Sequence, residues 1–486
     1  MTLYDLLDGV EYGPTVGLNT DIQSIVIDSR LAAAKSLFVC IPGTKADGHD
    51  YIHAAAANGA AAIVCERLPD SPPADVTMIK VADARAALAR MAANLQGRPA
   101  EGMTMLGVTG TNGKTSITYF MEAILRAAGR RAGVIGTSGA RVGDDVLDIP
   151  YAASTTPDAV ELHKILREMK DSGADSVVME ATSHALAQRR VDGIPFAIGM
   201  FTNLTQDHLD YHGTMENYRA EKAKLFDMAK TGVFNADDPH AAAIMQNAAC
   251  RAVTYGIDAA CDYKAENVVL SHEGVAYDIC IAEETVRIKS PVPGRFTVYN
   301  TLCAVAAAAE LGIPADVICA GLESVENVPG RIQAVPNDYG FGVIVDYSHT
   351  PDGVANIIKA VRGFTEKRLI TVVGCGGDRD RTKRPIMGRI AGEGSDYVIL
   401  TSDNPRSERP ADIIAEIEPG VRETKCPYTK LANRREAIFE AVQMAQPGDN
   451  IILAGKGNED YQEFENKRRE PFDDVLVAKE ALGARE

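Results

Sequence analysis

The stretch "MTMLGVTGTNGKTSITYF", residues 103–120, limits the fold more than any other part of the sequence. An apolar run typical of a strand leads into a glycine-containing loop, and after Lys114 apolar residues recur at helical spacing until Gly129. A strand, a glycine loop and a helix in this order form a phosphate-binding loop, because backbone N–H groups and the helix N-terminus face an anion. The usual pattern has a glycine where this chain has Val108, and here the additional glycine is Gly110. The sequence therefore predicts a nucleotide-binding α/β domain with a tight loop.

The residues of this loop have separate expected roles. Lys114 would reach the outer phosphates of a nucleotide, and the hydroxyl of Thr115 would bind Mg²⁺. The predicted ATP-binding residues of the loop are Gly110, Thr111, Asn112, Gly113, Lys114, Thr115 and Ser116. The alternative is a glycine turn that only joins a strand to a helix.

The rest of the chain repeats the same alternation of short apolar strands and helical stretches. This alternation predicts an α/β fold with mainly parallel sheets and helices on both faces, and residues 262–292 predict an antiparallel side sheet. We expect three domains, at residues 1–98, 99–329 and 330–486, with "GRPAEG" at 97–102 as the first linker. In the third domain four strands each lead into a polar loop, and such loops form ligand sites at the carboxyl ends of parallel strands.

Composition excludes several classes of function. The 486 residues carry a formal net charge of -17, which argues against a nucleic-acid-binding protein. The sequence contains no signal peptide and no apolar run long enough to span a bilayer, so we expect a cytoplasmic protein without membrane insertion. Its nine cysteines form no CxxC pair and are expected to be reduced, mostly buried thiols.

Acidic and histidine residues gather after two of the predicted strands. Glu180 ends the strand "DSVVME", where nucleotide-binding folds place a metal-binding acid, and "FTNLTQDHLDYHG" at 201–213 contains two His and two Asp within six residues. Carboxylates without nearby cysteines favour Mg²⁺ over zinc. The alternative is that this cluster is a structural turn.

Taken together, the motifs resemble the Mur ligase family, the ATP-dependent amide ligases that build the peptidoglycan stem peptide. The resemblance runs from "IDSR" at Asp28 to "AGKGNEDYQ" near Tyr461 and is carried, in order, by "GTNGKTS", "EATSHAL", "TNLTQDHLDYHG", "YRAEKAKLF", "FNADDP", "VPGR", "VDYSHTPD" and "GCGGDRDRTKRPIMG". It is most similar to the members that add the third residue of the peptide. It implies an N-terminal domain for a uridine nucleotide, a central ATPase-like domain, a C-terminal Rossmann-like domain that binds an amino acid, and a monomer.

The resemblance also implies the reaction. ATP would phosphorylate the D-glutamate γ-carboxylate of UDP-N-acetylmuramoyl-L-alanyl-D-glutamate, and the amine of the incoming amino acid would displace the phosphate. Lys114, Glu180, His208 and Lys222 would carry the chemistry, with Thr115, Glu180, His208 and Lys222 as Mg²⁺ ligands. Lys222 matches the lysine that the family carbamylates (N6-carboxylysine), which turns a cation into a metal ligand. Without the motif Lys222 would be interpreted as a surface lysine, and Lys224 is the competing candidate.

Substrate contacts follow from the same match. Further ATP-binding residues would be Asn300, Arg331 and Asp346. The sugar-peptide nucleotide would contact the "PGTKADGHD" loop and Ser29, Ser154, Thr155, Thr156, Ser183, Gln188 and Arg190. Each of these residues also has an ordinary structural interpretation, such as a helix cap or a surface arginine.

The segment "SDNPRSE" indicates the incoming amino acid. It resembles the signature of family members that add meso-diaminopimelate, a lysine analogue with a second carboxylate at its far end. Arg406 would pair with that carboxylate and would repel the terminal ammonium of lysine. The predicted diaminopimelate-binding residues are Arg379, Asp403, Asn404, Pro405, Arg406, Gly455 and Glu459.

Three alternatives remain open at this stage. The same ligation could use L-lysine, although Arg406 argues against it. A folylpolyglutamate synthase shares the loop and the chemistry but lacks the N-terminal uridine-type domain. The third alternative is a non-catalytic ATP-binding relative, against which intact Lys114, Glu180, His208 and Lys222 argue. The chain also departs from the usual family pattern at Ser154, Thr297, Gln333 and Asn458.

Overall fold

The computed structural model describes residues 1–43, 46–147, 155–271 and 273–485. The chain forms two compact units, which we call unit 1 (Met1–Lys264 with Leu302–Ile318) and unit 2 (Ala265–Thr301 with Cys319–Glu486). The chain passes from one unit to the other within helices α10 (Arg295–Glu310) and α11 (Ala315–Glu323). Within the described ranges, no helix is both long and apolar enough to cross a membrane.

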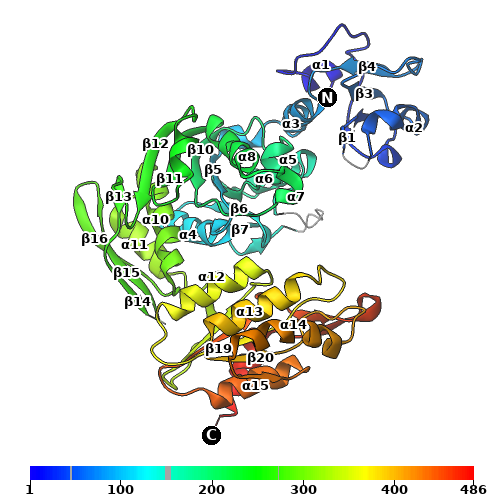
Figure 1. Ribbon diagram of the computed structural model, residues 1–486. Helices are drawn as coiled ribbons and strands as arrows, with labels where there is room; N and C mark the ends of the chain where they lie inside the picture. Colours follow the sequence, from blue (N-terminus) through cyan, green and yellow to red (C-terminus); the bar gives the residue numbers. More distant parts are fainter. Residues whose placement is uncertain (44–45, 148–154, 272, 486) are drawn as a thin grey trace. The chain divides into compact units, whose positions relative to one another are not determined.

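The N-terminal part of unit 1 contains a parallel sheet with the strand order β1-β2-β3-β4 (Figure 1). The strands are β1 (Ser24–Val26), β2 (Ser36–Val39), β3 (Ala62–Cys65) and β4 (Thr77–Lys80), and the helices are α1 (Leu3–Leu6), α2 (Ile52–Ala57) and α3 (Ala84–Leu95). Alternate strand residues enter two separate cores: Leu37 and Val39 pack with α1 and α3, whereas Phe38 packs with α2. The predicted helices on both faces of the sheet are therefore confirmed here.

The central sheet of unit 1 has the order β13-β12-β11-β10-β5-β9-β6-β7-β8 and is parallel except at the β6–β7 and β7–β8 pairs. Its strands are β5 (Thr104–Thr109), β6 (Ala132–Gly136), β7 (Gly139–Val142), β8 (Asp145–Val146), β9 (Ser176–Glu180), β10 (Phe196–Phe201), β11 (Ala229–Asn235), β12 (Arg251–Gly256) and β13 (Tyr263–Lys264). Its helices are α4 (Lys114–Ala127), α5 (Ala159–Asp171), α6 (Ser183–Ala187), α7 (Leu209–His212), α8 (Met215–Asp227) and α9 (Ala241–Met245). Strand β5 lies between β10 and β9, so the phosphate loop starts near the middle of this sheet.

Unit 2 contains the predicted antiparallel side sheet and a mainly parallel C-terminal sheet. The side sheet is β14 (Glu266–Ser271), β15 (Gly274–Ile281) and β16 (Glu284–Ser290). The C-terminal sheet is β17 (Gln333–Ala334), β18 (Gly342–Asp346), β22 (Asn450–Ala454), β19 (Leu369–Val373), β20 (Tyr397–Leu400) and β21 (Tyr428–Lys430), in that spatial order, with only β17 antiparallel among these strands. A small hairpin, β23 (Tyr461–Glu463) and β24 (Arg469–Pro471), follows β22.

Helices cover both faces of the C-terminal sheet (Figure 1). The helices are α12 (Pro351–Arg362), α13 (Lys383–Gly394), α14 (Pro410–Thr424), α15 (Arg434–Met444) and α16 (Asp474–Gly483). Leu369 and Val373 pack on the side of α12, α13 and α14, whereas Ile370 and Val372 pack on the side of α15 and α16. Because β18, β22, β19 and β20 run parallel, their carboxyl ends and the four polar loops meet at one edge.

Two expectations from the sequence are wrong in detail. The predicted linker 97–102 contains the short helix η3 (Pro99–Gly102), in which Pro99 and Ala100 are buried, because Ala100 belongs to the core of the central sheet. Of the nine cysteines, which are all free, four are buried, four are partly buried and Cys280 is exposed, so they are not mostly buried. The predicted α/β fold class is confirmed, and the exact domain boundaries stay predictions.

Candidate active site

The phosphate loop lies between β5 and α4, as its sequence predicts. Gly110 and Gly113 have positive φ angles of 147° and 92°, which residues with a Cβ rarely adopt. A Cβ on Gly110 would also lie 1.8 Å from the Thr202 hydroxyl at the end of β10. Lys114 Nζ donates to the carbonyl oxygens of Gly110 and Thr111, at 3.0 Å each. The loop conformation is therefore held by hydrogen bonds from Lys114, and Thr202 after β10 packs closely against Gly110.

Asn112, Thr115 and Ser116 complete this turn. The Asn112 carbonyl accepts a hydrogen bond from Thr202 Oγ1 at 2.6 Å, and Asn112 N donates to Asn203 Oδ1 at 3.0 Å. Thr115 and Ser116 lie in the first turn of α4. The structure thus brings all seven predicted loop residues together at a helix N-terminus, where anions are favoured.

Thr115 and Glu180 form a buried oxygen pair next to this loop. Thr115 Oγ1 donates to Glu180 Oε1 at 3.0 Å, and the backbone N–H of Thr137 donates to the same oxygen at 2.9 Å. Glu180 lies at the end of β9, which is the strand next to β5 in the sheet. Two residues 65 positions apart therefore present a hydroxyl and a carboxylate at one point.

Lys222 is buried, although its sequence context is that of a surface helix. Only 1% of the residue is exposed, and its Nζ donates to the Gly110 carbonyl at 2.8 Å, the same oxygen that Lys114 contacts. Burial, and secondarily the charge of Lys114, lowers the pKa of Lys222 well below its usual value. The competing Lys224 is 44% exposed and pairs with Glu221. Of the two lysines, only Lys222 lies at the phosphate loop.

His208 begins α7 in a left-handed conformation, with φ at 52°. Its ring lies 4.7 Å from the ring of His184, and its Nε2 lies 3.4 Å from Asp207 Oδ2. Within the described ranges, no three His, Cys, Asp or Glu side chains lie close enough to hold a metal ion. The structure therefore places Thr115 and Glu180 in contact and does not gather His208 with them into a ready-made ligand cluster.

The residues predicted for the sugar-peptide substrate surround α6. Thr156 Oγ1 donates to the Glu180 carbonyl at 2.8 Å, and Arg190 Nη1 donates to the Thr156 carbonyl at 2.7 Å. Gln188 Oε1 accepts hydrogen bonds from the same guanidinium. Thr155 contacts Thr137, and Ser183 contacts His212. These five predicted residues thus lie beside Glu180, whereas Ser154 is outside the described residues.

Burial lowers the pKa of Arg190, which nevertheless stays cationic because an arginine loses its proton only far above neutral pH. Ser29, the remaining residue of this group, lies in the N-terminal domain in the short helix η1 (Ser29–Leu31). It is buried, and its carbonyl accepts a hydrogen bond from Asn58. The contacts of Ser29 therefore lie within that domain.

In unit 2 the predicted diaminopimelate residues converge at the edge where the polar loops meet. Asn404 Nδ2 donates to Glu459 Oε2 at 2.8 Å. Gly455 has φ at 126°, and a Cβ there would lie 2.4 Å from Asp403 Oδ2. Arg406 Nη1 donates to the Gly377 carbonyl at 2.8 Å, and Arg406 Nε lies 3.7 Å from Glu463. Arg379, on the same loop as Gly377, donates to the Asp378 carbonyl. The structure therefore brings together loops after β19, β20 and β22.

The ATP residues predicted in unit 2 lie in a second loop pair. Asp346 Oδ2 accepts a hydrogen bond from Ile332 N at 2.9 Å, which joins the end of β18 to the "VPGR" turn. The Arg331 guanidinium lies 5.6 Å from the centre of the Tyr347 ring. Asn300 is buried in α10. Arg331 and Asp346 are thus linked through Ile332, the residue after Arg331, whose backbone N–H donates to the Asp346 carboxylate.

Several residues at these loops were missed by the sequence analysis. Arg434 is fully buried with Asp474 and donates to the carbonyl of Ser402, two residues after β20, and to that of Ala454, the last residue of β22. Lys456 Nζ donates to Asn404 Oδ1 and Glu459 Oε2, at 3.0 Å each. Lys456 stands within "AGKGNE" and could have been found there, whereas no local pattern identifies Arg434.

Comparisons with known proteins match the chain over nearly its whole length. Three domain families match: "Mur ligase family, catalytic domain" over residues 21–96, "Mur ligase middle domain" over 108–308, and "Mur ligase, glutamate ligase domain" over 330–457. The UDP-N-acetylmuramoyl-L-alanyl-D-glutamate--2,6-diaminopimelate ligase of Caldanaerobacter subterraneus subsp. tengcongensis is 44% identical over 100% of both chains.

Solved structures of Mur ligases and of a folylpolyglutamate synthase also resemble this chain. A structure of UDP-N-acetylmuramoyl-L-alanyl-D-glutamate--2,6-diaminopimelate ligase matches at 31% identity with a TM-score of 0.74, covering 100% of this chain and 99% of that one. Folylpolyglutamate synthase of Mycobacterium tuberculosis shares the fold at 18% identity with a TM-score of 0.61, covering 82% of this chain and 96% of its own. The similarity to the first structure therefore extends over the whole length, and the similarity to the second does not.

Proposed function

Because this chain belongs to the Mur ligase family, we propose that it joins meso-2,6-diaminopimelate to UDP-N-acetylmuramoyl-L-alanyl-D-glutamate in an ATP-dependent reaction. The bond formed is an amide between the D-glutamate γ-carboxylate and an amine of diaminopimelate, in a step of peptidoglycan precursor synthesis in the cytoplasm. The names of full-length relatives at 44% and 43% identity support this substrate pair. The observation that carries the proposal is the arginine-bearing loop Asp403–Arg406 at the edge where the polar loops meet.

The reaction needs an activated carboxylate, because a carboxylate ion is a poor electrophile. Transfer of the ATP γ-phosphate to the D-glutamate carboxylate gives an acyl phosphate and ADP. The amine then attacks the acyl carbon, phosphate leaves, and the amine loses a proton. Lys114 and the backbone N–H groups of the loop bind and neutralise the phosphates, so the protein contributes by positioning and electrostatics.

Mg²⁺ fits the oxygen pair beside the loop. Thr115 and Glu180 offer a hydroxyl and a carboxylate, the donors that Mg²⁺ prefers, and nucleotide phosphates would supply further oxygens. When bound, the ion neutralises charge on the transferred phosphoryl group. His208 is our further candidate ligand. Lys222 as an ammonium would repel the ion, and as a carbamate it would add an anionic oxygen.

Burial makes Lys222 suited to that modification. A lysine with a lowered pKa is a neutral amine for more of the time, and only the neutral amine adds to CO₂. The carbamate would lie beside Gly110, where the amine lies now. These roles of Lys222 and His208 are part of the proposal.

Arg406 distinguishes diaminopimelate from lysine. Its side chain is 18% exposed, and its recorded contacts use Nη1 and Nε. A guanidinium in this setting binds a carboxylate and disfavours an ammonium, and diaminopimelate differs from lysine by that carboxylate. Asn404 and Glu459 lie beside it and would bind the amino group at the same end.

The first experiment measures phosphate release from ATP by the full chain with UDP-N-acetylmuramoyl-L-alanyl-D-glutamate as acceptor. We expect release with meso-diaminopimelate and at least about tenfold slower release with L-lysine. Faster release with L-lysine would keep the ligase and overturn the specificity. Nucleotide binding without release with either amino acid would favour a non-catalytic relative.

A further inference from the structure

Arg384, a fully buried arginine on α13, contacts Glu408 in the loop that carries Arg406. Its guanidinium donates to both carboxylate oxygens of Glu408, at 2.7 and 2.8 Å, and to Glu416 at 2.8 Å. It also donates to the Gly376 carbonyl at 3.2 Å. A buried bidentate pair of this kind holds both partners in one geometry.

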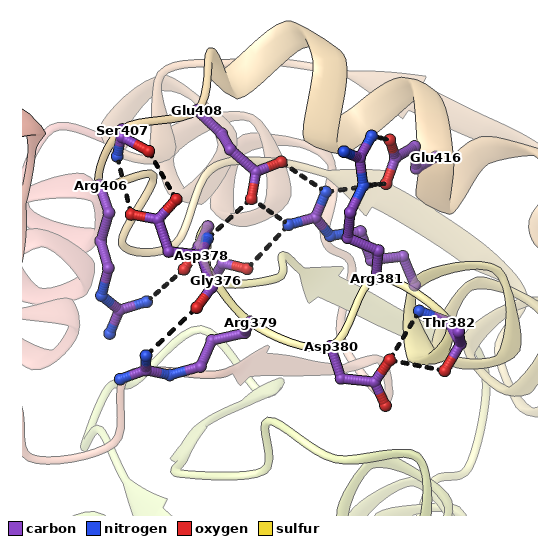
Figure 2. A network of polar contacts seen from close by, with 12 residues as sticks. Gly376, Asp378, Arg379, Asp380, Arg381, Thr382, Arg406, Ser407, Glu408 and Glu416 are labelled. Atoms are coloured by element: carbon purple, nitrogen blue, oxygen red, sulfur yellow. Dashed lines mark hydrogen bonds and ion pairs between the residues drawn. The ribbon is translucent and has the colours of Figure 1, made fainter.

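Glu408 passes this fixed geometry on to the neighbouring loop. Its Oε1, already bound to Arg384, also accepts the backbone N–H of Asp378 at 2.7 Å. The Asp378 carboxylate in turn accepts hydrogen bonds from Ser407 N at 3.2 Å and Ser407 Oγ at 2.5 Å (Figure 2). Glu408 and its neighbour Ser407, in the loop after β20, therefore both bind Asp378 in the loop after β19.

Arg406 stands two residues before Glu408 and completes the connection. Its Nη1 donates to the Gly377 carbonyl, and Gly377 N donates to the Asn404 carbonyl at 2.9 Å. Asp378 and Arg406 both have left-handed backbone, with φ at 55° and 50°. Such conformations persist only where surrounding contacts hold them, and here the contacts to Glu408 and Ser407 do so.

The negative charge of Glu408 is balanced by the positive charge of Arg384. A carboxylate two residues from Arg406 would compete with a substrate carboxylate for the same guanidinium. With both of its oxygens engaged by Arg384, Glu408 is neutralised by a different arginine. Arg406 donates to the Gly377 carbonyl and lies 3.7 Å from Glu463, so among the described residues Glu463, and not Glu408, is the carboxylate with which a substrate would compete.

We propose that Glu408, held by Arg384, is a positioning residue that sets Arg406 for the distal carboxylate of the incoming amino acid. The proposal rests on the proposed function, because it assigns that substrate to this loop. It adds the Arg384–Glu408 pair to Arg406 as residues that determine which amino acid the site accepts.

Glu416 provides a matched control. Glu408 and Glu416 both bind Arg384 and are similarly exposed, at 20% and 29%. Glu416 also pairs with Arg381 in the loop after β19, but of the two only Glu408 accepts the backbone N–H of Asp378 beside Ser407 and Arg406. We expect Glu408→Gln to raise the KM for diaminopimelate about tenfold, while kcat and the KM for ATP change less than about twofold. We expect Glu416→Gln to change the KM for diaminopimelate less than about twofold.

Equal effects of the two substitutions, or a parallel fall in kcat and rise in both KM values, would overturn the positioning role. If Glu408→Gln does not fold, Ser407→Ala removes only an exposed hydroxyl bond to Asp378 and should raise the KM for diaminopimelate about threefold. An unchanged KM in that variant would also contradict the proposal. Wild-type protein that releases no phosphate with diaminopimelate would instead contradict the proposed function.

Discussion

At the scale of single residues, the two lysines at the phosphate loop are chemically different. Lys114 and Lys222 both donate to the Gly110 carbonyl, yet they reach it from different elements, the start of α4 and the middle of α8. Lys222 is also covered by the Tyr218 ring, whose centre lies 4.6 Å from its Nζ. The loop thus has one lysine suited to phosphates and one whose amine is shielded from water.

Lys222→Ala should therefore reduce ligation about a hundredfold or more, because it removes the side chain that we propose becomes the carbamate. A short-chain carboxylic acid should partly restore turnover by entering the space left by the side chain. Lys224→Ala, an exposed neighbour on the same helix, should change turnover less than about twofold. Steady-state phosphate release measures all three, and wild-type turnover in Lys222→Ala would contradict the carbamate.

At the scale of elements, helix α4 is bounded by two glycines with different surroundings. Gly110 precedes it and has Thr202 Oγ1 at 1.8 Å from a built Cβ, whereas Gly129 follows it and has nothing within 4 Å. Both have positive φ, at 147° and 73°. An alanine would strain the backbone at both positions, but of these two positions it would clash with a neighbouring side chain only at Gly110.

Gly110→Ala should raise the KM for ATP at least about tenfold, because the clash with Thr202 moves the loop whose N–H groups bind phosphates. Gly129→Ala should lower stability by about 1 kcal/mol without changing the KM for ATP. Thermal unfolding and ATP titration of both variants make the comparison. Similar KM values in the two variants would show that the clash does not matter.

At the scale of the whole molecule, one buried histidine links pH to stability. His163 lies on α5 in unit 1 and is 1% exposed, and among the described residues neither of its ring nitrogens has a hydrogen-bond partner. Burial lowers its pKa from 6.5 to about 4. The unfolded chain takes up a proton below pH 6.5 and the folded chain does so only near pH 4, so the stabilising contribution is complete above pH 6.5 and is lost as pH falls toward 4.

We expect this residue to cost about 2 kcal/mol of stability between pH 7 and pH 5. His163→Leu cannot be protonated and should show a correspondingly smaller loss of stability over the same range. Urea unfolding of the full chain at both pH values measures the difference. Identical pH dependence in the two proteins would exclude His163 as its source.

Much of the candidate site was predicted from the sequence because its residues are local. The phosphate loop occupies consecutive positions between a strand and a helix, Glu180 is the last residue of an apolar strand, and Asp403 comes three positions after another. Parallel pairing then places such strand ends at one edge of a sheet, whatever the length of chain between them. Most roles of individual residues came from the family resemblance, and all of these roles, including those of Lys222, His208 and Arg406, stay predictions.

Only the tertiary structure decided the features that depend on distant contacts. Lys222 donates to the Gly110 carbonyl 112 positions away, and Arg384 pairs with Glu408 24 positions away. No local sequence pattern therefore predicts the burial of Lys222 or the pairing of Arg384. Ala100 also packs with distant residues in the core of the central sheet, and it lies in the short helix η3 where the sequence predicted a linker. The sequence by itself determined the fold class and the chemistry of each loop, because strands, turns and helix starts follow from neighbouring residues. The structure decided which side chains lose water and which loops hold one another, because those outcomes depend on packing between segments far apart in the chain.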